Sequence, residues 1–193
     1  MSLRTYGLSA ALMLTLTTLP TTLPAVTPTE PSAPSAARAV SATAASFASL
    51  DGRTIDLRSG WGAATACSTD GHTTQCWTSE AAMDAAIGAM PTAASTIPGS
   101  RSLAPCSSSL RLYDGASFTG TVLAFVSTGT LVNLSVYGFS NRTTSYKVGN
   151  CSALFYDGSN GSGTVYPGNT NANAQSPSMV LGWNNRISSF YMF

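Results

Sequence analysis

The chain has 193 residues, of which only 9% are charged, and its formal net charge is +1. It therefore lacks the clustered Lys and Arg of a nucleic-acid-binding surface, and we expect no nucleic-acid partner. The low charge and the abundant small polar residues favour an all-β extracellular module over a helical cytosolic protein.

The first part of the chain is typical of a secretory signal. Residues 1–7 carry Arg4, residues 8–19 are nearly free of charge, and a region of small residues follows. The apolar run is too short to span a bilayer, which takes roughly 20 apolar residues. We therefore expect residues 1–39 to be a signal peptide with its cleavage region, and the product to be secreted without a membrane anchor. Three positions suit cleavage: Ala25, Ala37 and Ala39.

Four cysteines in an exported protein indicate disulfides, and three pairings are open to them. Cys67 and Cys76 flank an Asp-Gly dipeptide, which is a hairpin turn signal. The hairpin favours a Cys67–Cys76 bond and leaves Cys106 to pair with Cys151.

A small ordered segment is expected over residues 51–90. Ile55 and Leu57 alternate with polar neighbours, as in a short strand, and the cysteine hairpin follows. Residues 79–90 are rich in Ala with apolar residues on one face, which predicts a helix. Linkers of small residues are expected on both sides, over residues 40–50 and 91–105.

The rest of the chain repeats itself. Residues 111–120 (RLYDGASFTG) match residues 154–163 (LFYDGSNGSG), and residues 137–146 match residues 181–190 in the same order. The two copies lie 43–44 residues apart. A repeat of this period indicates a duplicated supersecondary unit. Short apolar runs separated by Gly, Asn and Ser predict short strands, and four strands per unit fit a Greek key.

The first motif of the repeat resembles the Greek-key signature of the βγ-crystallins. Tyr113, Phe118 and Gly120 carry the spacing Tyr-x4-Phe-x-Gly. The second copy keeps Tyr156 and Gly163 but has a glycine at the aromatic position. We therefore expect the second hairpin to pack less well than the first.

The second motif resembles the Asn/Asp-Asn/Asp-x-x-Ser/Thr-Ser pattern of the same superfamily. Residues 184–189 (NNRISS) match it in full, and residues 140–145 (SNRTTS) match it except at the first place. The resemblance covers residues 106–193 and implies an all-β fold of two Greek-key motifs in a βγ-crystallin-like sandwich, with keys at about 106–150 and 151–193. The cysteine-linked, secreted form is similar to the bacterial metalloproteinase-inhibitor family of this fold.

Catalytic residues are scarce. Residues 106–193 contain no histidine and no glutamate, and their only acids are Asp114 and Asp157, at equivalent turn positions. The single histidine, His72, lies in the cysteine hairpin. A Ser-His-Asp triad needs that histidine beside a serine and an acid, and a zinc site needs three or four ligands. We therefore expect a protein that is not an enzyme.

The resemblance also implies calcium sites, each joining one Asn/Ser loop to the hairpin of the other key. Each site holds at most one acid, so we expect weak binding, on the order of 0.1–1 mM, and no required cofactor. The alternative is that the Asn and Ser side chains satisfy turn backbone groups without metal. Carried over by position, the two sets are Asn185 and Ser188 with Asp114, and Asn141 and Thr144 with Asp157.

The leading hypothesis is a secreted inhibitor of metalloproteinases that acts by surface occlusion. A rigid, cross-linked scaffold suits an inhibitor because little entropy is lost on binding. The inhibitory loop is unknown; the polar loop 166–178 is either a presenting surface or a connection. The alternatives are an extracellular calcium-binding βγ-crystallin-like module and an antimicrobial or toxin-like protein of the same fold.

Overall fold

The structure is a computed structural model that describes residues 46–89, 109–126, 129 and 131–193. The expected signal over residues 1–39 and the linker 91–105 lie outside the described residues. So does Cys106, and with it the expected Cys106–Cys151 bond. Within the described ranges, no helix has the length and apolar character needed to cross a membrane.

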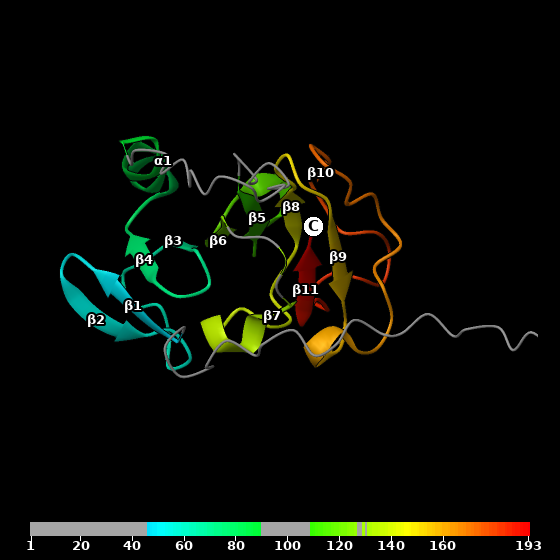
Figure 1. The fold of residues 1–193 in the computed structure, drawn as a ribbon, viewed down its shortest axis with the longest axis horizontal. Coiled ribbons are helices and arrows are strands. Elements are labelled where there is room, and N and C mark those ends of the chain that lie inside the picture. Colours follow the sequence, from blue (N-terminus) through cyan, green and yellow to red (C-terminus); the bar gives the residue numbers. More distant parts are fainter. Residues whose placement is uncertain (1–45, 90–108, 127–128, 130) are drawn as a thin grey trace, which may run out of the picture. The chain divides into compact units, whose positions relative to one another are not determined.

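The described residues form two sheets, one α-helix and three short 3-10 turns (Figure 1). The larger sheet has the order β10-β8-β5-β6-β3-β4-β1-β2, and the smaller has the order β7-β11-β9. The strands are β1 (Phe47–Leu50), β2 (Arg53–Asp56), β3 (Ala66–Thr69), β4 (Thr74–Trp77), β5 (Leu110–Tyr113), β6 (Val122–Phe125), β7 (Leu131–Asn133), β8 (Ser145–Lys147), β9 (Ala153–Tyr156), β10 (Gln175–Ser176) and β11 (Ser189–Met192). The helical elements are α1 (Glu80–Ala89), η1 (Ala116–Phe118), η2 (Leu134–Tyr137) and η3 (Ser159–Gly161).

Each Greek key gives its third strand to the sheet of the other key. In the first key, β5, β6 and β8 belong to the larger sheet, whereas β7 pairs with β11. In the second key, β9 pairs with β11 in the smaller sheet, whereas β10 pairs with β8. The predicted all-β sandwich of two Greek keys is confirmed, and each sheet contains strands from both keys.

The segment before the keys extends the larger sheet. Strand β3 runs parallel to β6, with Ala66 opposite Val122, and β4 joins β3 to β1. Strand β1 corrects one expectation, because its four residues lie in the stretch that was expected to be a linker. Small residues such as Ala48 form a strand there because β2 and β4 hydrogen-bond to β1 on both sides.

The predicted Cys67–Cys76 disulfide is confirmed. The two cysteines lie directly opposite each other in the β3–β4 hairpin, with their Cα atoms 4.0 Å apart. Asp70 fixes the turn, because its Oδ1 accepts hydrogen bonds from the backbone amides of His72 and Thr73. The His72 side chain is exposed, as expected of a turn residue.

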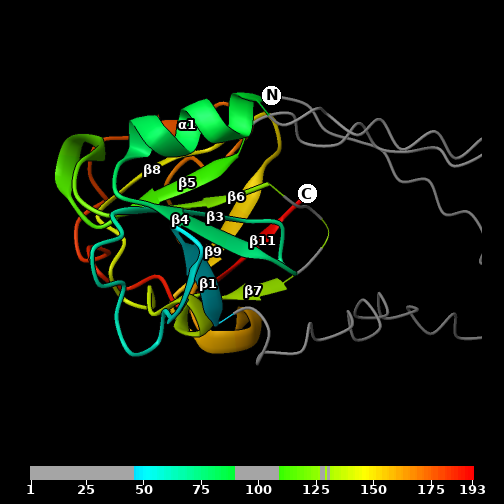
Figure 2. The same ribbon diagram turned by 90° about the vertical axis from the view of Figure 1, so that its left-hand side faces the viewer.

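The larger sheet has an apolar cluster on each face, because successive residues of a strand point to opposite sides. The main cluster lies between the two sheets and includes Phe125, Tyr146 and Phe190, with the Phe125 and Phe190 ring centroids 4.5 Å apart. The smaller cluster contains Tyr113 and Met83 and lies between the sheet and α1. Figure 2 shows the helix along this face of the sheet.

Helix α1 confirms the prediction for residues 79–90. The Ser79 hydroxyl accepts a hydrogen bond from the backbone amide three residues on, which is an N-cap interaction. Glu80 accepts hydrogen bonds from the Arg111 guanidinium and the Tyr113 hydroxyl, and Arg111 also pairs with Asp84. These contacts fix the helix against β5.

Removal of residues 184–193 should unfold the protein. The deletion takes away β11, the central strand of the smaller sheet, and with it Phe190, whose loss alone costs about 3–5 kcal/mol. That is a large part of a typical stability of about 5–15 kcal/mol. Loss of the thermal transition and of the near-ultraviolet circular dichroism signal would show it. Removal of the exposed Phe193 alone is the control and should leave the melting temperature almost unchanged. A truncated chain that melts like the full chain would contradict the assignment of β11.

Candidate functional site

The two Asn/Ser motifs form loops that bind each other. We call residues 140–145 the first Asn/Ser loop and residues 184–189 the second. The backbone amide of Asn141 donates to the carbonyl of Ile187 over 2.8 Å, and the amide of Asn185 donates to the carbonyl of Thr143 over 3.0 Å. The two contacts are equivalent, so the repeat in the sequence appears as a local two-fold arrangement in the structure.

The same arrangement brings two pairs of side-chain oxygens together. Ser188 Oγ donates to Asn141 Oδ1 at 3.0 Å, and Thr144 Oγ1 donates to Asn185 Oδ1 at 3.2 Å. Both asparagines are exposed and both have positive φ, 58° at Asn141 and 57° at Asn185. Asparagine is one of the few residues that adopt this conformation readily, which fits its place in both loops.

Each oxygen pair lies beside the start of one hairpin. The Thr144 amide donates to the carbonyl of Tyr113, just before Asp114, and the Ser188 amide donates to the carbonyl of Tyr156, just before Asp157, both at 2.8 Å. The hydroxyl residue therefore sits at the hairpin of its own key, while the amide oxygen comes from the other key.

This geometry differs from the sets carried over from the resemblance. Each expected set took its asparagine and its hydroxyl residue from the same loop. The loops pass each other around the local two-fold, so each asparagine instead faces a hydroxyl of the opposite loop. The pairs observed are Thr144 with Asn185 near Asp114, and Ser188 with Asn141 near Asp157.

An arginine from each loop neutralises the hairpin aspartate of its own key. Arg142 Nη2 lies 2.6 Å from Asp114 Oδ2, and Arg186 Nη2 lies 2.6 Å from Asp157 Oδ2. Each guanidinium also donates to a backbone carbonyl four residues earlier. Both pairs are partly exposed to solvent, which screens the attraction between the charges, so each adds little to stability. Their larger effect is to leave almost no net charge beside the oxygen pairs.

The other carboxylate oxygen explains why a glycine recurs at the same place in both copies of the repeat. Asp114 Oδ1 accepts a hydrogen bond from the Thr121 amide, and Asp157 Oδ1 does the same in the second key, both at 2.6 Å. Gly120 and Gly163 each have a φ of +80°, and a Cβ atom at either place would overlap that Oδ1 atom. These positions therefore require glycine.

The hairpins differ at the aromatic position of the motif. Phe118 adopts a φ of +62°, and its ring packs edge-on against Tyr113 with centroids 5.8 Å apart. Left-handed backbone costs a side chain about 1–2 kcal/mol, which this packing must offset. The equivalent Gly161 avoids that strain, and the side chain of Leu131 lies beside it, 3.3 Å from where a Cβ would be. The place of the missing aromatic ring is thus taken by an aliphatic side chain from β7.

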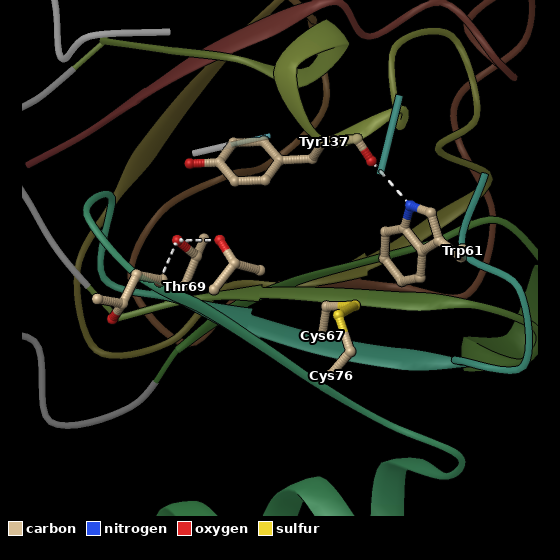
Figure 3. Close-up of a disulfide and its surroundings, with 7 residues drawn as sticks. Trp61, Cys67, Thr69, Cys76 and Tyr137 are labelled. Atoms are coloured by element: carbon tan, nitrogen blue, oxygen red, sulfur yellow. Dashed lines mark hydrogen bonds between the residues drawn. A yellow bond between two sulfur atoms is a disulfide. The ribbon is translucent and has the colours of Figure 1, made fainter. Parts of the chain in front are cut away.

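Trp61, from the segment before the keys, contacts the first loop region. Its Nε1 donates to the carbonyl of Tyr137 at 2.8 Å (Figure 3). Its ring lies against Phe139, and the Arg142 guanidinium lies over both rings. In the second key Arg186 lies over Trp183, an aromatic residue of the same key. The recurrence of arginine in both motifs was visible in the sequence, but the contact of Trp61 had no sequence signal.

The oxygen pairs suit a hard cation such as Ca²⁺ in their chemistry. Calcium takes six to eight oxygen ligands at about 2.3–2.6 Å, including amide and backbone carbonyls and water. Two protein oxygens 3.0–3.2 Å apart are close enough to share one ion. Among the described residues no group of three or more His, Cys, Asp and Glu could hold a metal.

Part of the chain is similar to several solved structures. The chain is similar to a βγ-crystallin from Ciona intestinalis (23% identity, 44% of this chain and 99% of that chain, TM-score 0.38). It is also similar to the N-terminal domain of protein S (21%, 45% and 96%, 0.37) and to a βγ-crystallin domain from Clostridium beijerinckii (19%, 44% and 97%, 0.37). No protein-family model and no curated protein matches the chain.

The pKa of Asp157 is lowered, first by the hydrogen bond from the Thr164 amide and then by Arg186. A carboxyl whose pKa is depressed by folding stabilises the protein above its unfolded pKa of about 3.9, and this stabilisation is lost as the pH falls through the folded pKa. In Arg186→Gln the pKa should rise but stay below its ordinary value, because the amide bond remains. Carboxyl NMR titration measures it. Arg186→Lys keeps the charge and should hold the pKa lower than Arg186→Gln does; equal values in the two variants would refute a charge effect.

Thr143→Val should stabilise the protein. Thr143 is fully buried at the place that Ile187 fills in the second loop, and its hydroxyl has no hydrogen-bond partner among the described residues. A buried unsatisfied hydroxyl costs about 1–3 kcal/mol, and each kcal/mol shifts the melting temperature of a chain of this size by about 2–4 °C, so its removal should raise the melting temperature by about 2–12 °C. The matched control is Thr170→Val, which removes a buried hydroxyl that donates to Ala153 and should lower the melting temperature. A lower melting temperature in both variants would count against the prediction.

Proposed function

We propose that the protein is a secreted, non-enzymatic binding module of βγ-crystallin-like fold that takes up calcium weakly at its two Asn/Ser loops. The observation that carries the proposal is the duplicated oxygen pair, Thr144 with Asn185 and Ser188 with Asn141. Each pair is reached from the surface through an exposed asparagine. The disulfide between β3 and β4 supports an oxidising, extracellular location.

The charges around the loops set the expected affinity. Both hairpin aspartates are held by arginines, so the oxygen pairs contribute neutral ligands only. Calcium affinity follows ligand charge, and extracellular modules bind with dissociation constants on the order of 0.1–1 mM. When bound, each ion would link one loop to the other and replace the one side-chain hydrogen bond of its oxygen pair.

Calcium should stabilise the folded chain. Calcium at about 100 times its dissociation constant adds about 2.7 kcal/mol for one site, and smaller ratios add less. We expect a higher melting temperature in 10 mM calcium than in chelator, with little effect of magnesium at the same concentration. Isothermal titration should give two sites per chain.

Two variants separate the sites. Thr144→Val removes the hydroxyl of one pair, and Ser188→Ala removes that of the other; each should reduce the stoichiometry to one. Ser135→Ala, an exposed serine outside the loops, should leave it at two. An unchanged melting temperature in calcium, with no heat of binding in the wild type, would remove the proposal.

A second candidate function is inhibition of a secreted metalloproteinase by surface occlusion. One feature favours it: Leu181 is presented at the tip of a fixed turn, with a relative exposure of 102%. The loop 166–178 is less suited to this role, because β10 and the buried Tyr166 tie it to the two sheets. Titration of a thermolysin-like metalloproteinase with the purified chain tests this candidate.

A further inference from the structure

The two loop arginines occupy the one charged oxygen that an ion at each oxygen pair could use. In the second key, Asp157 Oδ1 accepts the Thr164 amide, so Oδ2 is the oxygen that is left, and Arg186 Nη2 lies 2.6 Å from it. The first key repeats this arrangement with Asp114 and Arg142. Carboxylate oxygens are among the ligands that calcium takes. A guanidinium and a calcium ion beside the loop therefore compete for the same atom.

These two carboxylates are the only source of negative charge in the keys. Residues 109–193 contain no acid other than Asp114 and Asp157. Each adjoins one oxygen pair, because the amides of Thr144 and Ser188 bond to the carbonyl of the residue before each aspartate. Release of the arginine would give the site its one formal charge, and calcium affinity follows the charge of the ligands.

The first key holds its arginine more firmly than the second. The Arg142 guanidinium carbon lies 4.9 Å from the ring centre of Phe139 and 5.7 Å from that of Trp61. The Arg186 carbon lies 4.7 Å from the ring centre of Trp183, the repeat equivalent of Phe139, and the described residues place no second ring over it. The Arg142 side chain is 36% exposed, against 48% for Arg186. A second cation–π contact therefore makes Arg142 the harder of the two to displace.

The second ring comes from the segment before the keys, which has no counterpart in the repeat. Trp61 is buried, and its Nε1 donates to the carbonyl of Tyr137 (Figure 3). The carbonyl of Leu57 lies so close to Gly138 that a Cβ atom there would overlap it. This part of the segment is thus fixed against the turn whose glycine carbonyl Arg142 also binds. The segment covers one loop arginine and leaves the other open.

We infer that Arg142 and Arg186 are built-in competitors of calcium, and that Trp61 makes the two sites unequal. The site at Asp157 fills first, because Arg186 leaves one ring and turns into solvent. The site at Asp114 fills at a higher calcium concentration, because Arg142 must leave two rings. The segment before the keys thereby sets the affinity of one site. This inference rests on the proposed calcium binding.

Isothermal titration with calcium chloride ranks the two sites while both arginines stay in place. Thr144→Val leaves the site at Asp157 intact, and Ser188→Ala leaves the site at Asp114 intact. The dissociation constant of Ser188→Ala should be larger than that of Thr144→Val by a factor on the order of 10, as expected from one additional cation–π contact.

Removal of either arginine should tighten its own site. Arg186→Gln and Arg142→Gln each release a carboxylate oxygen, so the dissociation constant of the affected site should fall by a factor on the order of 10–100. Arg53→Gln removes an exposed arginine on β2, outside both loops, and is the matched control for net charge. It should change neither constant. In the wild type, the side-chain Nε–H signal of Arg186 in NMR spectra should shift at a lower calcium concentration than that of Arg142.

Two variants of Trp61 test the cause of the inequality. Trp61→Leu removes the second ring and should bring the dissociation constant of the site at Asp114 close to that of the site at Asp157. Trp61→Phe keeps a ring over Arg142 and should keep most of the difference. Thermal melting without calcium shows whether each variant is folded. If Trp61→Leu is not, the order of the two arginine signals in the wild type decides the question.

The outcomes separate this inference from calcium binding itself. Equal constants at the two sites, an earlier shift of the Arg142 signal, or no gain of affinity in Arg186→Gln would overturn the inference and leave the proposed function standing. Binding that occurs only in the arginine variants supports the competition and removes calcium binding as the function of the wild type. No binding in the wild type or in any variant removes both.

Discussion

The structure depends on two similar Greek keys, each of which completes the other. Two backbone hydrogen bonds join the first Asn/Ser loop to the second, and each key lends its third strand to the sheet of the other. Neither key has a complete sheet or a closed core by itself. Because the exchange is reciprocal, a residue that stabilises one key usually has a counterpart with the same task in the other.

The aspartate–arginine pair that recurs in both keys holds three segments of each key together. In each key the aspartate uses one oxygen to hold the hairpin backbone and the other to hold an arginine of the loop. The arginine in turn binds a carbonyl at the turn before the loop. Hairpin, loop and preceding turn are thereby fixed to one another by side chains that recur at the same interval in the sequence. The oxygen pairs are held in place by the same contacts.

The sequence predicted the elements whose cause is local or repeated. The hairpins at Tyr113 and Tyr156, the helix after Ser79 and the Cys67–Cys76 bond all follow from turn residues, capping and spacing. The pairing of Asn185 with Thr144 was missed, because it depends on how two loops pass each other in space. Strand β1 was missed for a similar reason: its residues have little preference for a strand, and two neighbouring strands supply the hydrogen bonds. The parallel contact of β3 with β6 had no sequence signal at all.

Trp61 packs over the first key, so the equivalent residues 137 and 181 are under different structural constraints. The side chain at residue 137 must fit among Phe125 and its neighbours, and a change there disturbs the fold. The side chain at residue 181 touches no core, so many residues are compatible with folding there. One copy of the duplicated unit thus maintains the architecture, while the other can vary a surface side chain at little structural cost.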